Sequence, residues 1–385
     1  PPTRLSSLRA HPELLSLLAA AWVAFYPYFV YYSAALMTEM FYITAILWSL
    51  YIATHLAHSH YSRLETPPRS NDFSRSRFIL LGLALGTAVL LRQVYLAFIP
   101  FLLAWLTLIL ARIPRLTQQP PELAAAPLSP HGTAAGVAAS PPPLSLPGRG
   151  VGGEGAPPSP HPSFPAKLAP LSGPLLSLLI LALTILPISL WNYHQFGRFV
   201  LLNTNAGYAF FWANHPVHGD DFVPLFTPDM PTYQSLIPAE LRALDEAALE
   251  KALMARGVDF VFADPWRYVR LSLSRIDDHF YFLPKADSSR LSNLTRVTSL
   301  GVALPFMLLG MGAWILRTYR LQAGNLLRRL LGLLAEPGGL LLLFIAVYVG
   351  VHLLSWAGIR YRLPTDAVML LFAAYSIYSF PRWGE

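Results

Sequence analysis

The chain of 385 residues contains no cysteine, and only 13% of its residues are charged. Without cysteine it can form neither a disulfide nor a cysteine-ligated metal site, so any part outside a membrane has to be held by packing. Hydrophobic residues make up 54% of the chain, and its mean hydropathy is +0.44. A soluble protein of this length does not have so apolar a composition. The sequence therefore predicts a polytopic membrane protein.

Long apolar runs set the expected architecture. A helix needs about 20 apolar residues to cross the hydrocarbon core of a bilayer. Eight runs approach that length, the third being the shortest: 13–33, 37–57, 77–91, 94–111, 171–190, 296–317, 338–357 and 364–380. We expect an all-α polytopic membrane protein, a bundle of about eight transmembrane helices with a mixed extracytoplasmic segment.

Arginines indicate how the runs are oriented, because short loops rich in Lys and Arg stay in the cytoplasm. The connections after the second, fourth and sixth runs carry Arg63, Arg69, Arg75, Arg77, Arg112, Arg115, Arg317, Arg320, Arg328 and Arg329. We expect a multi-pass protein of the bacterial inner membrane (the cell membrane). Both termini of this chain should lie in the cytoplasm, and segment 191–295 should lie on the outer side. The net charge of +7 is then mainly a topology signal, and it indicates no nucleic-acid partner.

Composition divides the chain into five parts. These are N-terminal membrane helices (1–112), a Pro-, Ala- and Gly-rich cytoplasmic loop (113–170), one membrane helix (171–190), the extracytoplasmic segment (191–295) and C-terminal membrane helices (296–385). The loop cannot bury enough apolar area to offset its ordering entropy, so we expect it to be disordered.

The extracytoplasmic segment changes character along its length. Up to about residue 226, aromatic residues alternate with turn residues such as Asn203, which predicts short strands or irregular loops. Leucines three to five residues apart predict a helix over 238–254. Asp264 and Pro265 predict the cap and the first residue of a second helix, whose aromatic and arginine content is typical of a helix in the membrane interface.

Two acidic pairs, Asp220–Asp221 and Asp277–Asp278 beside His279, could bind a divalent cation. Neither pair has a third carboxylate at a known ligand spacing, so solvated charges in a loop and at a helix end are the favoured interpretation. No other cofactor is indicated.

The few polar residues near the ends of the apolar runs share one side of the membrane. Threading the runs alternately brings the following residues to the outer side: Glu39, Arg92, Asn192, Arg360 and Arg362. An arginine at the bilayer centre costs about 2.5 to 3.5 kcal/mol on insertion scales and less near the edge, so we expect Arg92 to have an anionic partner. Arg360 and Arg362 flank Tyr361 just before Pro364, where we expect a helix to begin. Two guanidinium groups there suit bidentate binding of phosphate or pyrophosphate.

Each of these residues also has an ordinary structural interpretation. Glu39 follows Thr38 at a helix N-terminus, where a carboxylate favours the helix dipole. Arg92 could extend to lipid headgroups, and Arg360 and Arg362 could anchor the chain to them. Asn192 adds a directional hydrogen-bonding group at the end of a membrane helix. Gly82 and Gly86 lie one helical turn apart, and we expect them to allow close helix packing.

Several short segments, in their order along the chain, resemble bacterial family 39-like glycosyltransferases. These polytopic GT-C enzymes are related to dolichyl-phosphate-mannose protein mannosyltransferases and to lipid A aminoarabinose transferases. The segments are Phe25-Tyr26-Pro27-Tyr28, Tyr32-Ser33, Thr38-Glu39, Gly82 and Gly86 before Leu91-Arg92, Leu186-Pro187, Trp191-Asn192-Tyr193, Phe196-Gly197, Asn203-Thr204-Asn205-Ala206-Gly207-Tyr208 and Arg360-Tyr361-Arg362-Leu363-Pro364.

The resemblance implies sugar transfer from a polyprenyl-phosphate donor to a lipid, protein or glycan acceptor on the outer face, among membrane lipids. It implies that the site is lined by Glu39, Arg92, Asn192, Arg360, Tyr361 and Arg362. The aspartate that acts as base in the family lies on a first outer loop upstream of this sequence, which begins with Pro1, so we expect an N-terminally incomplete chain with no catalytic base assigned by motif. A lipid-linked-oligosaccharide transporter or ligase, and an inactive fragment or scaffold, are the alternatives.

Overall fold

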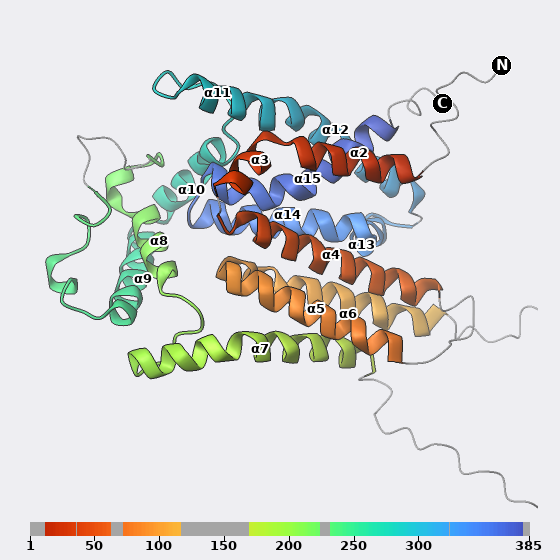
Figure 1. Ribbon diagram of the computed structural model, residues 1–385, viewed down its shortest axis with the longest axis horizontal. Coiled ribbons are helices and arrows are strands. Elements are labelled where there is room, and N and C mark those ends of the chain that lie inside the picture. Colours follow the sequence, from red (N-terminus) through yellow and green to blue (C-terminus); the bar gives the residue numbers. More distant parts are fainter. Residues whose placement is uncertain are drawn as a thin grey trace, which may run out of the picture.

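The computed structural model describes residues 12–35, 37–62, 72–116, 169–223, 232–322 and 324–379. Most of the expected disordered loop, 117–168, lies outside these described residues. Within them the chain is helical and contains no strand (Figure 1). The all-helical class expected from the sequence is therefore confirmed.

The bundle is formed by helices from both halves of the chain. The N-terminal half contributes α2 (Pro12–Phe25), α3 (Pro27–Ala34), α4 (Glu39–Ser62), α5 (Asp72–Leu91), the 3₁₀ turn η1 (Gln93–Ala97), α6 (Ile99–Leu116) and α7 (Ala169–Phe196). The C-terminal half contributes α11 (Arg290–Arg296), the π turn η5 (Val297–Gly301), α12 (Val302–Leu321), α13 (Leu326–Ala335), α14 (Pro337–Leu354) and α15 (Ile359–Ser379).

Five helical stretches in the described residues are long and apolar enough to cross a membrane, or six if α2 and α3, which meet at a bend of 53°, form one broken span. This supports a multi-pass membrane protein but gives fewer spans than the eight runs expected. The runs 77–91 and 364–380 do form helices, α5 and α15, but neither is among the candidate spans found in the described residues. Helix α15 is buried along most of its length between α2, α12 and α14, so it can carry Arg362 and Asp366 without exposing them to lipid.

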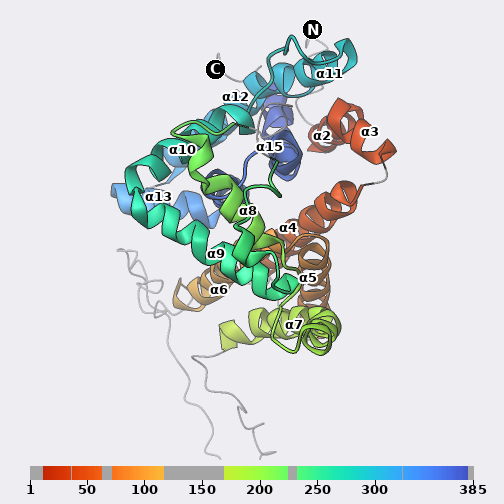
Figure 2. The same cartoon turned by 90° about the vertical axis from the view of Figure 1, so that its left-hand side faces the viewer.

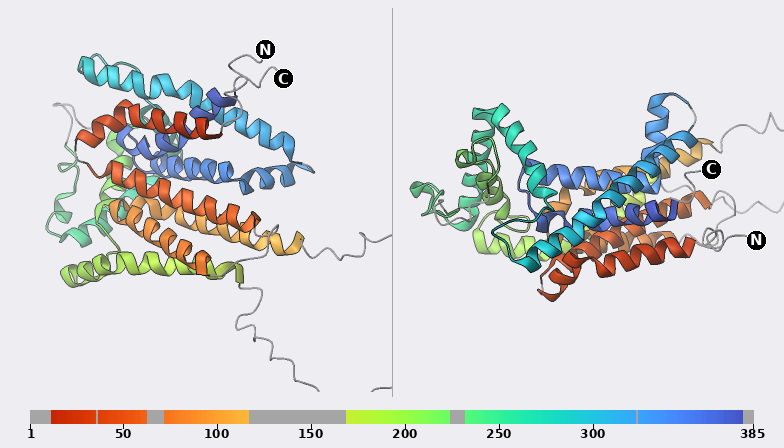
Figure 3. Two further views of the ribbon diagram at one scale, coloured as in Figure 1. Left: turned by 45° about the vertical axis from the view of Figure 1, so that its right-hand side comes forward. Right: turned by 90° about the horizontal axis from the view of Figure 1, so that it is seen from above.

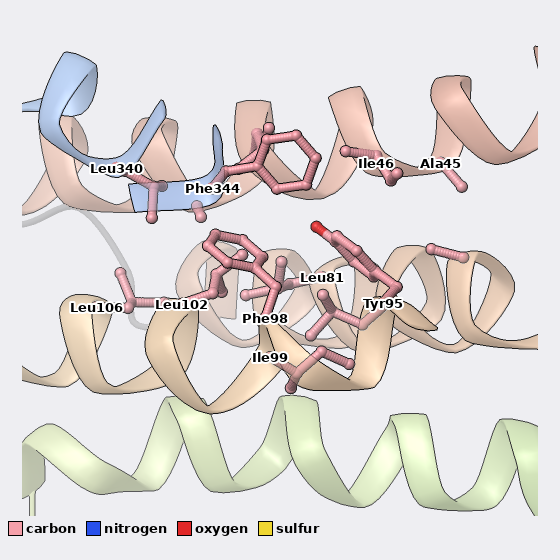
Figure 4. Close-up of a cluster of buried hydrophobic side chains, with 14 of the residues drawn as sticks. Ala45, Ile46, Leu81, Tyr95, Phe98, Ile99, Leu102, Leu106, Leu340 and Phe344 are labelled. Carbon is pink, nitrogen blue, oxygen red and sulfur yellow. The ribbon is translucent and has the colours of Figure 1, made fainter. Parts of the chain in front are cut away.

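Two apolar cores hold the bundle together. The larger joins α4, α5, α6, α7 and α14, and Figure 4 shows Phe98 and Phe344 facing one another inside it, with ring centroids 5.1 Å apart. Tyr95 lies beside them, and its hydroxyl shares a 2.6 Å hydrogen bond with the hydroxyl of Ser49. The smaller core joins α2, α3, α4, α12 and α15. Helices α4 and α15 are thereby fixed relative to each other.

A second group of helices lies at one end of the bundle, away from the start of α2 and the end of α15 (Figures 1 and 3). It contains α8 (Asn205–Asn214), α9 (Glu246–Ala263) and α10 (Pro265–His279). Figure 2 looks onto this end and shows the three helices in front of the bundle. This outer group comes from the segment 191–295 that the sequence placed outside the membrane.

The sequence predicted this outer group only in part. The strands allowed for up to residue 226 are absent from its described residues, where Asn203 instead accepts a hydrogen bond from the backbone of Asn205 at the start of α8. The helix expected over 238–254 begins later, at Glu246 after the cap Asp245, and continues to Ala263. The cap at Asp264 is confirmed, because its carboxylate accepts a 2.9 Å hydrogen bond from the backbone of Arg267.

Arg275 fixes helix α10 onto the bundle. It is fully buried, and its guanidinium donates to the carbonyl of Leu353 at the end of α14 (2.8 Å) and to the side chain of Asn214 in α8 (3.0 Å). Burial lowers the pKa of Arg275 to about 10, which still leaves it charged near neutral pH. The last turn of α10, with Asp277 and Asp278, is thereby held near the end of α14.

Three glycines mark places where helices approach each other closely. A Cβ on Gly82 would lie 2.6 Å from the backbone carbonyl of Ser177, and one on Gly86 would lie 2.7 Å from Thr184. The expected close packing at these two glycines is confirmed, with α7 as the partner of α5. A Cβ on Gly310 in α12 would lie 1.8 Å from the carbonyl oxygen of Phe372 in α15.

We predict that Gly310→Ala lowers the melting temperature of the protein in detergent, because α12 and α15 have to separate to admit the methyl group. Overpacking of this kind typically costs about 1 to 3 kcal/mol. Gly312→Ala is the matched control, since a Cβ at Gly312 meets no atom within 4 Å. An equal effect of the two substitutions on the melting temperature would contradict the close contact.

Candidate functional site

Glu39, Arg92 and Arg360 form an ion cluster where α4 and α15 begin. Glu39 begins α4 and is buried, and its Oε1 accepts hydrogen bonds from both the Arg92 and the Arg360 guanidinium groups. Arg92 lies at the break between α5 and η1, and Arg360 is the second residue of α15. We call these three residues the Glu39 cluster. The expected anionic partner of Arg92 is confirmed, and it is Glu39.

The Glu39 cluster has more positive than negative charge. One carboxylate faces two guanidinium groups, and its second oxygen, Oε2, is buried with no hydrogen-bond partner in the described structure. The Arg92 guanidinium lies over the rings of Tyr42 and Tyr361, 5.8 and 5.4 Å from their centroids. Ring quadrupoles stabilise a cation in this position. Tyr361 therefore belongs to the site through its contact with Arg92.

The sequence predicted that the guanidinium groups of Arg360 and Arg362 lie together, but in the structure they lie apart. Helix α15 begins at Ile359 and includes Pro364, so residues two apart point in directions that differ by roughly 200° around the helix axis. Arg362 is fully buried and donates to the Asp366 carboxylate (3.0 Å) and to the carbonyl of His279 (2.8 Å). Tyr26 also donates to Asp366, at 2.7 Å. Arg362 thus contacts protein groups inside the bundle, and the pair of neighbouring guanidinium groups predicted from the sequence is not formed.

Asn192 also has a structural contact. Helix α7 continues to Phe196, so Asn192 lies within it and does not close it. Its amide nitrogen donates to the backbone carbonyls of Val200 (3.1 Å) and Leu202 (2.9 Å), which hold the chain that returns from α7. Neither acceptor belongs to the Glu39 cluster, so Asn192 supports the fold beside the site.

Arg360 also lines a cavity of about 340 Å³ between the bundle and the outer group, which we call the outer cavity. Three cations and one carboxylate line it, together with aromatic rings and a short backbone segment. The lining residues are Phe222, Tyr233, Asp278, Tyr281, Lys285, Arg296, Trp356, Ala357, Gly358, Ile359, Arg360 and Tyr361. The Glu39 cluster therefore contributes one residue, Arg360, to the wall of this cavity.

Two of the three cations are placed by the aromatic ring of Tyr281. The Lys285 ammonium lies 4.6 Å and the Arg296 guanidinium 5.6 Å from its centroid. Arg296 is largely used by the protein, because it donates to the Asn293 side chain (2.8 Å) and to the carbonyl of Leu283 (3.2 Å). In the described part of the chain, no carboxylate forms an ion pair with Lys285. Lys285 can therefore bind an anionic ligand at little cost.

Arg360 has free capacity as well. Only its Nε is used in the ion pair with Glu39, and the two terminal nitrogens have no hydrogen-bond partner among the described residues. A guanidinium held by Nε presents its other edge as a pair of parallel donors, which matches the oxygens of a phosphate. The outer cavity thus combines fixed donors for an anion with aromatic walls.

Sequence reasoning missed most of this lining. Asp278 was interpreted as a solvated charge, and Lys285, Tyr281 and Trp356 were not singled out. Arg296 did give a signal, since it stands at the outer start of an apolar run, where an arginine is disfavoured. Their convergence depends on how the outer group folds back over α15, which no local pattern predicts.

The donor set of the outer cavity does not suit a metal ion. Three cations surround its one carboxylate, and in the described residues no group of three or more His, Asp or Glu side chains converges. Hard divalent cations are bound by several oxygen ligands, most of them carboxylates.

Comparisons of this chain with protein-family models, with curated proteins and with solved structures find no match.

We predict that Asp366→Asn strongly lowers the melting temperature, because it leaves the buried Arg362 without a counter-charge. Removing one partner of a buried ion pair typically costs about 3 to 5 kcal/mol. Asp220→Asn is the control, since Asp220 pairs with Arg270 on an exposed surface and its loss should leave the melting temperature unchanged. If both variants melt like the parent protein, the Arg362–Asp366 pair does not stabilise the bundle.

Proposed function

We propose that this chain is a membrane glycosyltransferase, which moves a sugar from a polyprenyl-phosphate donor to a lipid, protein or glycan acceptor on the extracytoplasmic face. The observation that carries the proposal is the outer cavity, where the Lys285 ammonium and the two terminal nitrogens of Arg360 present cationic donors beside aromatic rings at the end of a membrane bundle. The resemblance of the sequence motifs to family 39-like enzymes supports the same reaction.

Each part of the cavity has a role in this reaction. Arg360 and Lys285 bind the lipid phosphate, Glu39 and Arg92 hold Arg360 in position, and Tyr361 packs against Arg92. The aromatic side chains provide rigid apolar walls against which a sugar ring can pack. Arg362 and Asn192 act indirectly, by fixing the start of α15 and the chain after α7. The donor tail would lie in the adjacent bilayer.

Cationic donors already in place lower the barrier for sugar transfer. As the bond between the anomeric carbon and the phosphate breaks, negative charge grows on the phosphate oxygens. Donors fixed before the reaction stabilise that charge without reorganising. The acidic pairs in the sequence left a divalent cation possible, but the cationic lining of the outer cavity does not fit one, and no step is assigned to it.

A lipid-linked-oligosaccharide transporter is a second candidate, because α2 and α3 meet at a bend of 53° and would form a broken helix if both belong to one membrane span. Broken helices are typical of transporters, whose substrate sites lie where a helix is interrupted. The two candidates differ in outcome. A transporter moves a labelled polyprenyl lipid across the bilayer of a proteoliposome without cleaving it, whereas a transferase releases polyprenyl phosphate.

We predict that Arg360→Ala lowers the release of polyprenyl phosphate by about 10²- to 10³-fold, the typical effect of removing one fixed donor to a developing anion. The measurement uses the full protein in proteoliposomes, with a set of radiolabelled polyprenyl-phosphate hexoses and pentoses. Arg360→Lys should retain part of the activity, because the charge remains but the bidentate geometry is lost.

Arg290→Ala is the control for the Arg360 prediction. Arg290 begins α11, is exposed and does not line the outer cavity, so its loss should leave turnover unchanged. Turnover of Arg360→Ala equal to that of the parent protein would refute the role of Arg360. Failure of the parent protein to bind or cleave any of the donors would refute the proposed function itself.

A further inference from the structure

We infer that helix α13 (Leu326–Ala335) is an amphipathic surface helix that binds the headgroups of anionic phospholipids, on the side of the bundle opposite the outer cavity. The inference is independent of the proposed function. Helix α13 follows the candidate span that ends at Leu321 and precedes the one that begins at Pro337. It lies across the ends of its neighbours, at the end of the bundle away from the outer group (Figures 1 and 3). In a membrane, this position corresponds to the headgroup layer.

One face of α13 is apolar and exposed. At about 100° per residue, the leucines of the helix gather on one side of it. Leu333 is buried against the bundle. The other leucines are between 41% and 64% exposed, and they are Leu326, Leu327, Leu330, Leu331 and Leu334. Such a patch is poorly solvated by water, so another apolar phase has to cover it.

Lipid acyl chains fit this patch because the exposed surface of a candidate span continues into it. Leu316 and Leu321, in the last turns of α12, are 57% and 75% exposed, as expected for side chains that face hydrocarbon. Two tryptophans lie at the same level, where the membrane interface favours them. Trp105 donates a 2.8 Å hydrogen bond to the carbonyl of Leu334, and the ring of Trp314 packs against Gly338 at the start of α14.

The charge around α13 is positive and uncompensated. Arg328 and Arg329 lie on the side of the helix away from the exposed leucines, and Arg317 and Arg320 precede them at the end of α12. Within the described ranges, none of the four forms an ion pair with a carboxylate. Arg317 and Arg329 each donate to one protein oxygen, at 3.3 and 3.0 Å. Arg320 and Arg328 are exposed, and their guanidinium groups have no hydrogen-bond partner in the part of the chain that the structure describes.

These charges decide which lipid suits the surface. Any bilayer could cover the leucines, but only an anionic one also compensates the arginines, whose guanidinium groups match the oxygens of a lipid phosphate. Each basic side chain near an anionic membrane surface typically strengthens binding about fivefold. A second copy of this chain is a poorer occupant, because it would bring the same positive charge to the same surface. The combination of exposed leucines with unpaired arginines therefore points to anionic phospholipid.

The absence of cysteine from the chain allows a direct test, because Leu330→Cys provides a single site for a fluorescent label. The full labelled protein is reconstituted in vesicles of phosphatidylcholine and phosphatidylglycerol in equal amounts, with a nitroxide quencher on the acyl chains of one lipid or the other. We expect both lipids to quench the label, and phosphatidylglycerol to quench it more strongly. A label at Arg328→Cys, on the opposite face of α13, should be quenched much less by either lipid.

The role of the charges is tested in the same labelled protein. Arg320→Gln combined with Arg328→Gln should lower the preference for phosphatidylglycerol by about fivefold for each arginine removed. Arg256→Gln combined with Arg290→Gln removes the same charge from exposed positions at the other end of the molecule and should keep the preference.

Three results would overturn the inference. A label at position 330 that neither lipid quenches means that lipid does not cover the leucine face, as when a second copy of the chain covers it. Equal quenching by the two lipids means that the surface does not select anionic headgroups. A preference that survives the loss of Arg320 and Arg328 means that the arginines do not bind them. None of these measurements involves a sugar donor, so their failure leaves the proposed function standing.

Discussion

The structure depends on the ion pairing of Glu39 with Arg92 and Arg360. A buried carboxylate is costly unless it is paired, and Glu39 is buried, so the start of α4, the break after α5 and the start of α15 meet around it. Glu39 and Arg360, the most distant of the three in sequence, are separated by 321 positions. One carboxylate compensates only one of the two guanidinium groups, and the remaining positive charge lies at the wall of the outer cavity. The same pairing therefore holds the fold together and equips the site.

A second buried pair shows the contrasting case. Arg362 and Asp366 balance each other one helical turn apart on α15, and Tyr26 donates to the same carboxylate. The charges of this pair are compensated within the protein, and none of its three residues lines the outer cavity. Two arginines separated by a single residue thus have different roles because the helix turns them to different sides.

The sequence was sufficient where physics acts locally or through the bilayer. Hydropathy predicted a multi-pass helical protein, since the lipid imposes length and composition on each span, but it gave eight runs where five or six candidate spans are found in the described residues. Threading grouped Glu39, Arg92 and Arg360, which do meet in the structure. Sequence reasoning failed where a boundary depends on tertiary contact. Pro364 was taken as the start of a helix that in fact begins at Ile359, and this shift separates Arg360 from Arg362. The sequence could not show that Lys285, Arg296 and Asp278 line one cavity with Arg360. They meet only because the chain after α10 folds back to α15, and no local sequence pattern encodes that contact.

The outer cavity has one wall from the membrane bundle and one from the outer group, and this division bears on the kind of ligand it suits. Arg360 and Tyr361 come from the first turn of α15 and Arg296 from the end of α11, whereas Asp278 lies in the last turn of α10 and Tyr281 and Lys285 lie in the chain that follows it. A ligand with a polar head and an apolar tail can place its head between these walls and its tail in lipid, so it need not leave the bilayer. A water-soluble sugar nucleotide gains nothing from such a location. The position of the cation-lined cavity at the end of a helical bundle with candidate membrane spans therefore supports the proposal of a lipid-linked donor over a soluble one.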